Sequence, residues 1–359
     1  MPEQSSRPPV TYGVPGWLTA VVAVPVIIGL LYFGREFLIP LVIALLLFVL
    51  TAALVDLIES AKIAGWSPPR WLAHIIGFTI VLLGFAVIAV ILSSEADDFM
   101  NAAPRYAERF QNLIERIEFL LGARIIGAVE RAIAEVDVGA WVSNLASGAS
   151  GFLASVSLVM LYLAFLWAER QAFAAKLPLL AANQAGAARI SAVLHSISDS
   201  IKQYMLINAF TSAMSGAVAY VIFRLVGLDF AATLALIVFM AGFIPNIGAL
   251  IGITLPSLVA LMQFDTLTPI LIVLIGYGGA DQVISNVIQP AMQGKSLNLS
   301  TFMVMVSLSF WGAIWGGIGA FLAVPMMVIF MIICAEIPAL RPIAILFSGD
   351  GKLLSSDDA

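Results

Sequence analysis

Four amide side chains recur at helical spacing in the stretch GYGGADQVISNVIQPAMQGK, residues 276–295. The spacing i, i+4, i+7, i+11 predicts one face of an α-helix for Gln282, Asn286, Gln289 and Gln293. Pro290 has no N–H, so it should free the carbonyl of Asn286 beside this face. Amides next to a free carbonyl suit a cation or a polyol. The alternative is that each amide only bonds a neighbouring helix.

Asp281 lies in the same stretch and is the only acidic residue between Asp265 and Glu336. An ionisable group inside a membrane segment is by default a functional hypothesis. The structural alternative places Asp281 near the polar end of its span. We favour the functional interpretation, in which its carboxyl group takes up a coupling cation.

Two long apolar runs are interrupted by residues that break helices. Residues 231–262 contain Pro245, Asn246 and Gly248, and residues 300–338 contain the glycines and proline Gly312, Gly316, Gly319 and Pro325. Irregular backbone at membrane depth is tolerated where it lines a cavity or is buried in protein. We therefore expect the first set to lie on a solute path and the second set, with Pro290, to act as hinges. Close helix packing is the alternative use of these glycines.

The sequence offers little chemistry for catalysis or for a metal site. It has two histidines, one cysteine and no H-E-x-x-H or G-x-S-x-G motif, so we expect no enzyme, no metal and no cofactor. The net charge of −5 and pI near 5.1 argue against nucleic acid as a partner.

The composition places these residues in a membrane. Hydrophobic residues make up 61% of the chain, charged residues 11%, and the mean hydropathy is +1.04. A crossing helix needs about 20 apolar residues, which predicts spans at 17–34, 37–58, 71–93, 150–168, 206–227 and 267–289. The runs 231–262 and 300–338 are too long for one crossing, so each must fold back or break. We predict an all-α polytopic membrane protein of about eight membrane segments, including these two broken or re-entrant hairpins.

The distribution of Lys and Arg predicts the orientation. With both termini cytoplasmic, short outside loops carry only Arg35 and Arg224. The inside segments carry Arg7, Lys62, Arg70, Arg170, Lys176, Arg189, Lys202, Lys295, Arg341 and Lys352. The hairpins then enter the membrane from opposite faces, and paired interrupted segments of this kind are typical of the binding site of a secondary transporter.

The expected domain order follows from these spans. It is a cytoplasmic tail (1–16), three transmembrane helices (17–93), an extracytoplasmic amphipathic helical domain (94–149), a fourth span with a cytoplasmic amphipathic helix (150–205), a transport core (206–340) and a cytoplasmic tail (341–359). Within 94–149, apolar residues at steps of three and four predict one helix around 106–120 and a second around 125–136.

The order of four motifs resembles the autoinducer-2 exporter-like (AI-2E) family. They are FIPNIG, DQVISNVIQPAMQGKSLNLS, FWGAIWGGIGAFLAVP, and Glu336-Ile-Pro followed by SGDG. The resemblance implies a bacterial inner-membrane transporter that exports a small polar solute such as autoinducer-2, and some relatives are Na⁺ or Li⁺/H⁺ antiporters. It also implies a homo-oligomer, with a pentamer as one form. Asn246-Ile247 and Asn298-Leu-Ser300 depart from the family pattern near the expected path.

We therefore expect a secondary transporter that works by alternating access in a lipid bilayer. It would either export a polar solute or exchange Na⁺ or Li⁺ for protons. One alternative is a membrane scaffold or sensor that binds a partner through 94–149, for which deletion of 100–140 should matter and Asp281→Asn should not. Another is a channel, with fluxes far above those of a carrier.

Overall fold

A computed structural model describes residues 16–60, 68–121, 138–181, 183–245, 247–293 and 298–351. These residues are almost entirely helical, and the described ranges contain only an isolated antiparallel bridge between Leu299 and Ser348 in place of any strand. The prediction of an all-α chain is confirmed for these ranges.

The first half of the chain forms four long helices and one short turn. They are α1 (Gly16–Phe33), α2 (Arg35–Ser60), α3 (Arg70–Leu121), α5 (Val138–Lys176) and the 3₁₀ turn η1 (Leu177–Leu180). The second half contains α6 (Gln184–Val226), α7 (Ala231–Ala241), α8 (Ile247–Gln263), α9 (Leu267–Leu271), η2 (Ile272–Tyr277), α10 (Gly278–Val283), η3 (Ile284–Ile288), α11 (Gln289–Gln293), α12 (Thr301–Glu336) and α13 (Arg341–Phe347). The segments η2 and η3 are π-helical turns inside one helix, 267–293.

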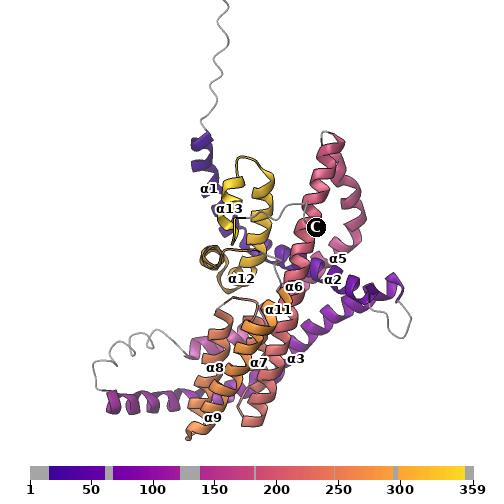
Figure 1. Ribbon diagram of the computed structural model, residues 1–359. Coiled ribbons are helices and arrows are strands. Elements are labelled where there is room, and N and C mark those ends of the chain that lie inside the picture. Colours follow the sequence, from indigo (N-terminus) through magenta and orange to yellow (C-terminus); the bar gives the residue numbers. More distant parts are fainter. Residues whose placement is uncertain are drawn as a thin grey trace, which may run out of the picture.

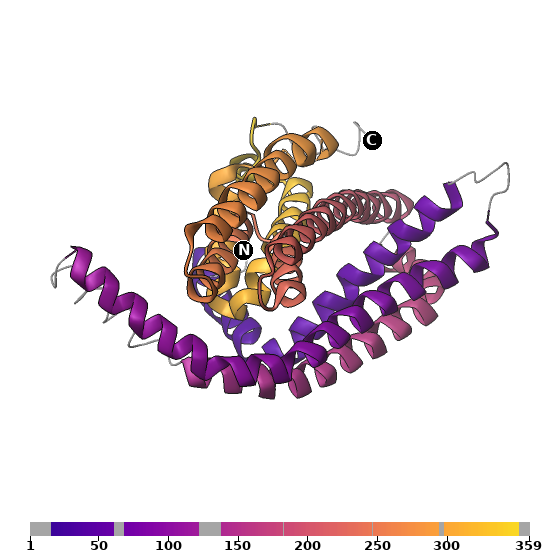
Figure 2. The same ribbon diagram turned by 90° about the horizontal axis from the view of Figure 1, so that it is seen from below.

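The helices are arranged on the two sides of α6. Helices α2, α3 and α5 pack against one another as a curved layer, most easily seen from below (Figure 2). Helix α6 contacts α2 of this layer as well as α7 and α12, and in Figure 1 the α12–α13 group lies beside its upper part and the α7–α9 group beside its lower part. Helix α6 is therefore the central element.

Six helices are long and apolar enough to cross a membrane, within the residues described. They are Arg35–Ser60, Arg70–Glu95, Ser155–Lys176, Gln184–Val226, Leu267–Gln293 and Thr301–Glu336. Shorter apolar helices are Val21–Phe33, Ala231–Ala241 and Ile247–Gln263. The chain is a polytopic helical membrane protein.

Two helices are longer than the predicted spans. Helix α3 continues without interruption from the span at 71–93 through the amphipathic stretch to Leu121, and α6 joins the amphipathic helix before residue 205 to the span at 206–227. The domain boundary expected at 205–206 therefore falls inside one helix, because no Gly or Pro interrupts its hydrogen bonding there. The predicted helix around 125–136 lies outside the described residues.

Both long apolar runs fold back on themselves. Helices α7 and α8 pack side by side, and Val238 and Ala241 of α7 lie against Gly252 and Gly248 of α8, as expected for antiparallel helices. Helix α12 reverses at Gly316, where φ is 64° and ψ is −146°. Across this turn the hydroxyl of Ser307 donates to the carbonyl of Ala323 at 2.8 Å.

Ion pairs connect segments that we predict to share a side of the membrane. Near the start of α6, Arg189 binds Glu336, and towards its middle Lys202 binds Asp56 from α2. Beyond the other end of α6, Asp229 binds Arg105 of α3. The assignment of either end of α6 to the cytoplasm stays a prediction.

Candidate transport site

A line of buried polar residues runs along α6, inside the apolar bundle. Asn208, Thr211, Ser212 and Ser215 are each at most 5% exposed. Their steps of three and four place them on one face of the helix. We name these residues, with Tyr277, Asp281 and Gln289 of the facing helix 267–293, the polar seam. The α6 half of the seam was not predicted, and its one sequence signal is a polar stripe within an apolar span.

Asp281 lies at the centre of the polar seam and is 5% exposed. Its Oδ1 accepts a hydrogen bond from the Ser215 hydroxyl at 2.9 Å and another from the Tyr277 hydroxyl at 3.3 Å. Its Oδ2 is buried and has no hydrogen-bond partner among the described residues. No salt bridge within the described ranges reaches this carboxyl group. A buried carboxylate without a counter-charge is costly, because water no longer solvates it.

Gln289 contributes to the seam, whereas two other predicted amides do not. The amide nitrogen of Gln289 donates to Oδ1 of Asn208 at 2.9 Å, and Asn208 is 2% exposed. Gln282 and Asn286 are exposed and bond each other at 2.7 Å. Gln293 is half-buried, two turns beyond Asn286.

The π-helical turns explain why the four amides do not share a face. A π turn contains one residue more than an α turn, so η3 (Ile284–Ile288) rotates everything after it relative to Gln282. The expected α-helical register does not hold through this turn, and the freeing of the Asn286 carbonyl by Pro290 stays a prediction. Such π turns occur often at functional sites.

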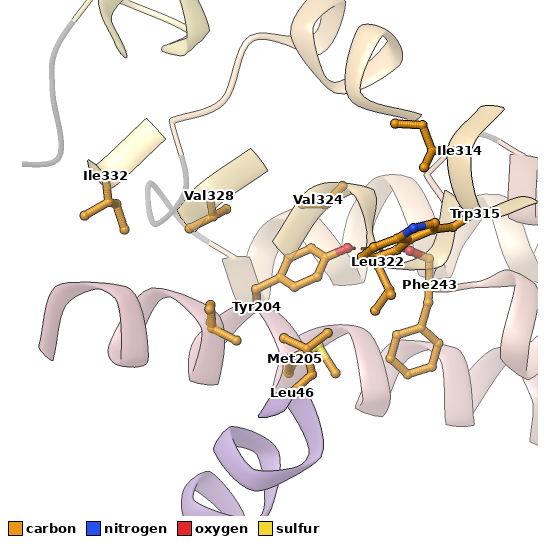
Figure 3. Close-up of a cluster of buried hydrophobic side chains, with 11 residues drawn as sticks. Leu46, Tyr204, Met205, Phe243, Ile314, Trp315, Leu322, Val324, Val328 and Ile332 are labelled. Atoms are coloured by element: carbon orange, nitrogen blue, oxygen red, sulfur yellow. Dashed lines mark hydrogen bonds between the residues drawn. The ribbon is translucent and has the colours of Figure 1, made fainter. Parts of the chain in front are cut away.

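The break between α7 and α8 lies beside the seam. The ring of Phe243 packs on Phe321 of α12 with centroids 4.9 Å apart. The backbone carbonyl of Phe243 accepts a hydrogen bond from the Tyr204 hydroxyl of α6 at 3.5 Å. Both residues belong to an apolar cluster that also contains Trp315 and Leu322 (Figure 3). The breaks of both hairpins therefore meet in an apolar cluster next to α6.

Ser212 connects the seam to this break. A Cβ atom placed on Gly242 would lie 2.6 Å from the Ser212 hydroxyl oxygen. That oxygen is buried and has no hydrogen-bond partner among the described residues. Two oxygens without partners, from Ser212 and Asp281, thus occur in one seam.

The other predicted path residues lie at the break itself. Pro245 is half-buried, and Asn246 lies outside the described residues. Gly248 is buried, and a Cβ atom there would lie 2.1 Å from the carbonyl oxygen of Ala241. Close packing of α7 on α8 thus requires a glycine at 248, and a further role on the path stays a prediction.

The predicted hinge residues differ in their surroundings. Gly316 forms the turn of α12, and a Cβ atom at Gly319 would lie 1.9 Å from the carbonyl oxygen of Trp311. A Cβ atom at Gly312 would meet nothing within 4 Å. Pro325 is buried in the second half of α12, and Pro290 is exposed in α11. Trp315, beside the turn, donates from its indole nitrogen to the carbonyl of Leu31 at 2.9 Å.

The chemistry of the seam fits a small, singly charged ion. Among the described residues, no group of three or more His, Cys, Asp or Glu side chains comes together as a metal site would require. One carboxylate with neighbouring hydroxyl groups can hold a proton or a monovalent cation, whereas Ca²⁺ takes six to eight oxygen ligands.

The sequence of residues 21–339 matches the family described as "AI-2E family transporter". The chain belongs to the AI-2E transporter family. The match covers α2 to α12, and with them the polar seam and both hairpins. The expected family resemblance is confirmed, and the protein is a membrane transporter.

Three curated relatives of the AI-2E chain carry transport names. The AI-2 transport protein TqsA of Escherichia coli K12 is 27% identical over 324 residues, which cover 89% of this chain and 92% of the relative. A putative transport protein of Borreliella burgdorferi is 31% identical and covers 57% of each chain. The putative transport protein YhhT of E. coli K12 is 26% identical and covers 72% of this chain and 74% of the relative.

Proposed function

We propose that this AI-2E transporter is a secondary transporter in which Asp281 couples a proton or monovalent cation to the movement of a small polar solute. The observation that carries the proposal is the Asp281 carboxyl group, which is buried, uncompensated by any described cation and left with one oxygen free. Binding H⁺, Na⁺ or Li⁺ relieves the cost of that burial.

The hairpins supply the moving parts in this proposal. Hairpins α7–α8 and α12 enter from opposite faces of the membrane, and their breaks meet at the Phe243–Phe321 contact. This contact closes the path on one side of the seam, and its separation opens the path. Alternating access by the displacement of broken segments is common among secondary transporters.

Export of an autoinducer-2-like solute is the first solute function to test. It rests on the name of the E. coli relative TqsA, which is similar over nearly the full length of both chains. The bacterial inner membrane, cytoplasmic termini and a homo-oligomer belong to the same proposal.

Exchange is tested in proteoliposomes that contain a pH-sensitive dye. Pulses of Na⁺ or Li⁺ are applied outside to the wild type, to Asp281→Asn and to Asp265→Asn. Asp265 is a matched control because it is exposed in the α8–α9 loop, outside the seam. We expect proton movement in the wild type and in Asp265→Asn, and none in Asp281→Asn.

A second assay separates solute coupling from exchange. Proteoliposomes loaded with autoinducer-2 are followed with and without an imposed pH or Na⁺ gradient. Efflux that accelerates with a gradient only when Asp281 is intact supports the proposal. Exchange or gradient-driven efflux that persists in Asp281→Asn removes Asp281 from the mechanism, and efflux indifferent to every gradient contradicts coupled transport.

A further inference from the structure

A cavity of about 570 Å³ lies where α3, the end of α6 and the start of α7 meet, away from the polar seam. The loop Gly227–Phe230 forms one wall. Its polar lining comes from Glu95, Asn101, Arg105, Tyr220, Arg224 and Asp229.

Both carboxylates of the cavity are already engaged by the protein. Asp229 accepts hydrogen bonds from Arg105 and from the Tyr106 hydroxyl, each at 2.9 Å. Glu95 accepts from the backbone N–H of Thr233 at 3.0 Å. These contacts stabilise the loop and leave little capacity to bind a cationic ligand.

Arg224 is the cation of this cavity that has no partner among the residues that the structure describes. It lies in the last turn of α6, is exposed, and makes no side-chain hydrogen bond or ion pair with any residue the structure describes. The dipole at the end of α6 favours a cation here, but it does not account for the space in front of it. A guanidinium group presents a fork of donors that matches the oxygens of a phosphate.

The cavity lies at the boundary of the apolar segments. The apolar part of α3 ends at Glu95, α6 ends at Val226, and α7 begins at Ala231. Tyr220, one turn before Arg224, is 43% exposed, as is common for tyrosine at the level of lipid headgroups. In a bilayer, phospholipid phosphates lie at the level where apolar membrane segments end.

We infer that this cavity binds a phosphate group, with Arg224 as the principal donor and Asn101, Arg105 and Tyr220 around it. The depth of the cavity favours the phosphodiester of a phospholipid headgroup over a free phosphate. This inference does not depend on the proposed coupling at Asp281.

Binding is measured by calorimetric titration of the full chain in a non-ionic detergent. The probes are dihexanoyl phosphatidylglycerol, dihexanoylglycerol, which lacks the phosphate, and inorganic phosphate. We expect the phospholipid to bind, the diacylglycerol not to bind, and Arg224→Gln to weaken phospholipid binding about tenfold or more. Arg341→Gln is the matched control, because Arg341 is exposed at the start of α13, outside the cavity.

The titration with inorganic phosphate distinguishes a phospholipid headgroup from a free phosphate as the ligand. Inorganic phosphate that binds as tightly as the phospholipid, with the same dependence on Arg224, assigns the cavity to a free phosphate. If the phospholipid binds and inorganic phosphate does not, the cavity is a site for a phospholipid headgroup.

Three results would overturn the inference: equal affinity in the wild type and Arg224→Gln, an equal loss in Arg341→Gln, or binding of the diacylglycerol. Ala232→Phe provides a second variant, because Ala232 lines the cavity and a larger side chain fills it without removing a charge. It should also weaken binding. Thermal unfolding of each variant establishes that it is folded.

Discussion

At the scale of single residues, the hydroxyl of Ser215 is the closest donor to Asp281. A hydrogen bond to a charged group contributes about 1.5–3 kcal/mol. We predict that Ser215→Ala slows cation-coupled transport about tenfold, less than the complete loss expected for Asp281→Asn. The initial rate of dye response in proteoliposomes measures this effect.

Ser215→Thr is the matched control, because threonine keeps the hydroxyl group. It should retain most of the rate. If Ser215→Ala transports as fast as the wild type, the contact of Ser215 with Asp281 has no part in coupling.

The sequence identified Asp281 because an acid inside an apolar span is rare. It did not identify Asn208 or Ser212, since serine, threonine and asparagine also serve as helix-packing residues in membranes. Only the pairing of α6 with the helix 267–293 separates the two uses, and that pairing is tertiary information.

At the scale of elements, the α7–α8 hairpin depends on a close approach of backbones at Gly248. We predict that Gly248→Ala destabilises the protein by about 1–3 kcal/mol, because the added methyl group meets the carbonyl of Ala241. The midpoint of thermal unfolding in detergent should fall.

Gly84→Ala is its control, because a Cβ atom at Gly84 in α3 meets nothing within 4 Å. The midpoint of thermal unfolding of Gly84→Ala should stay unchanged or rise, since alanine is a better helix former than glycine. An unchanged midpoint in Gly248→Ala would show that α8 can shift away from α7.

The turn of α12 gives a separate prediction at Gly316. Its φ of 64° and ψ of −146° are accessible to glycine almost alone. Gly316→Ala should cost about 1–3 kcal/mol of stability. Gly312→Ala should not, because a Cβ atom there meets nothing within 4 Å. Equal unfolding midpoints in the two variants would contradict the prediction that the turn requires glycine at 316.

Sequence reasoning located the breaks of both runs but not the π turns η2 and η3. Proline and glycine in the sequence indicate where an α-helix is interrupted. An inserted residue in a π turn has no comparable signature, and it is retained because of what the helix packs against. The predicted face of amides was wrong for this reason.

At the scale of the whole molecule, α3 connects the curved layer to the α7–α8 hairpin. Its 52 residues span about 78 Å, more than twice the thickness of the hydrocarbon core. Beyond its apolar part, Arg109 donates to the carbonyls of Met262 and Gln263 at the end of α8, at 3.0 and 2.6 Å. The open end of the hairpin is therefore held by the part of α3 that follows its apolar segment.

We predict that Arg109→Ala loosens this end of the hairpin, because two carbonyls lose a charged donor. Hydrogen exchange in 260–266 should become faster, while exchange in α2 stays unchanged. Glu108→Ala is the control, since Glu108 is exposed on the same turn of α3. Equal exchange in both variants would mean that α3 does not restrain the hairpin.

The reversal of α12 has one more consequence, which concerns handedness. A Cβ atom at Gly319 has no room, whereas one at Gly316 meets nothing within 4 Å, so only the backbone angles restrict position 316. Those angles are the mirror image of an extended conformation that ordinary L residues adopt freely. In a chain assembled by chemical ligation, the backbone angles at 316 would therefore favour a D-alanine and strain an L-alanine. Chirality thus separates a position that needs glycine for its backbone from one that needs it for its size.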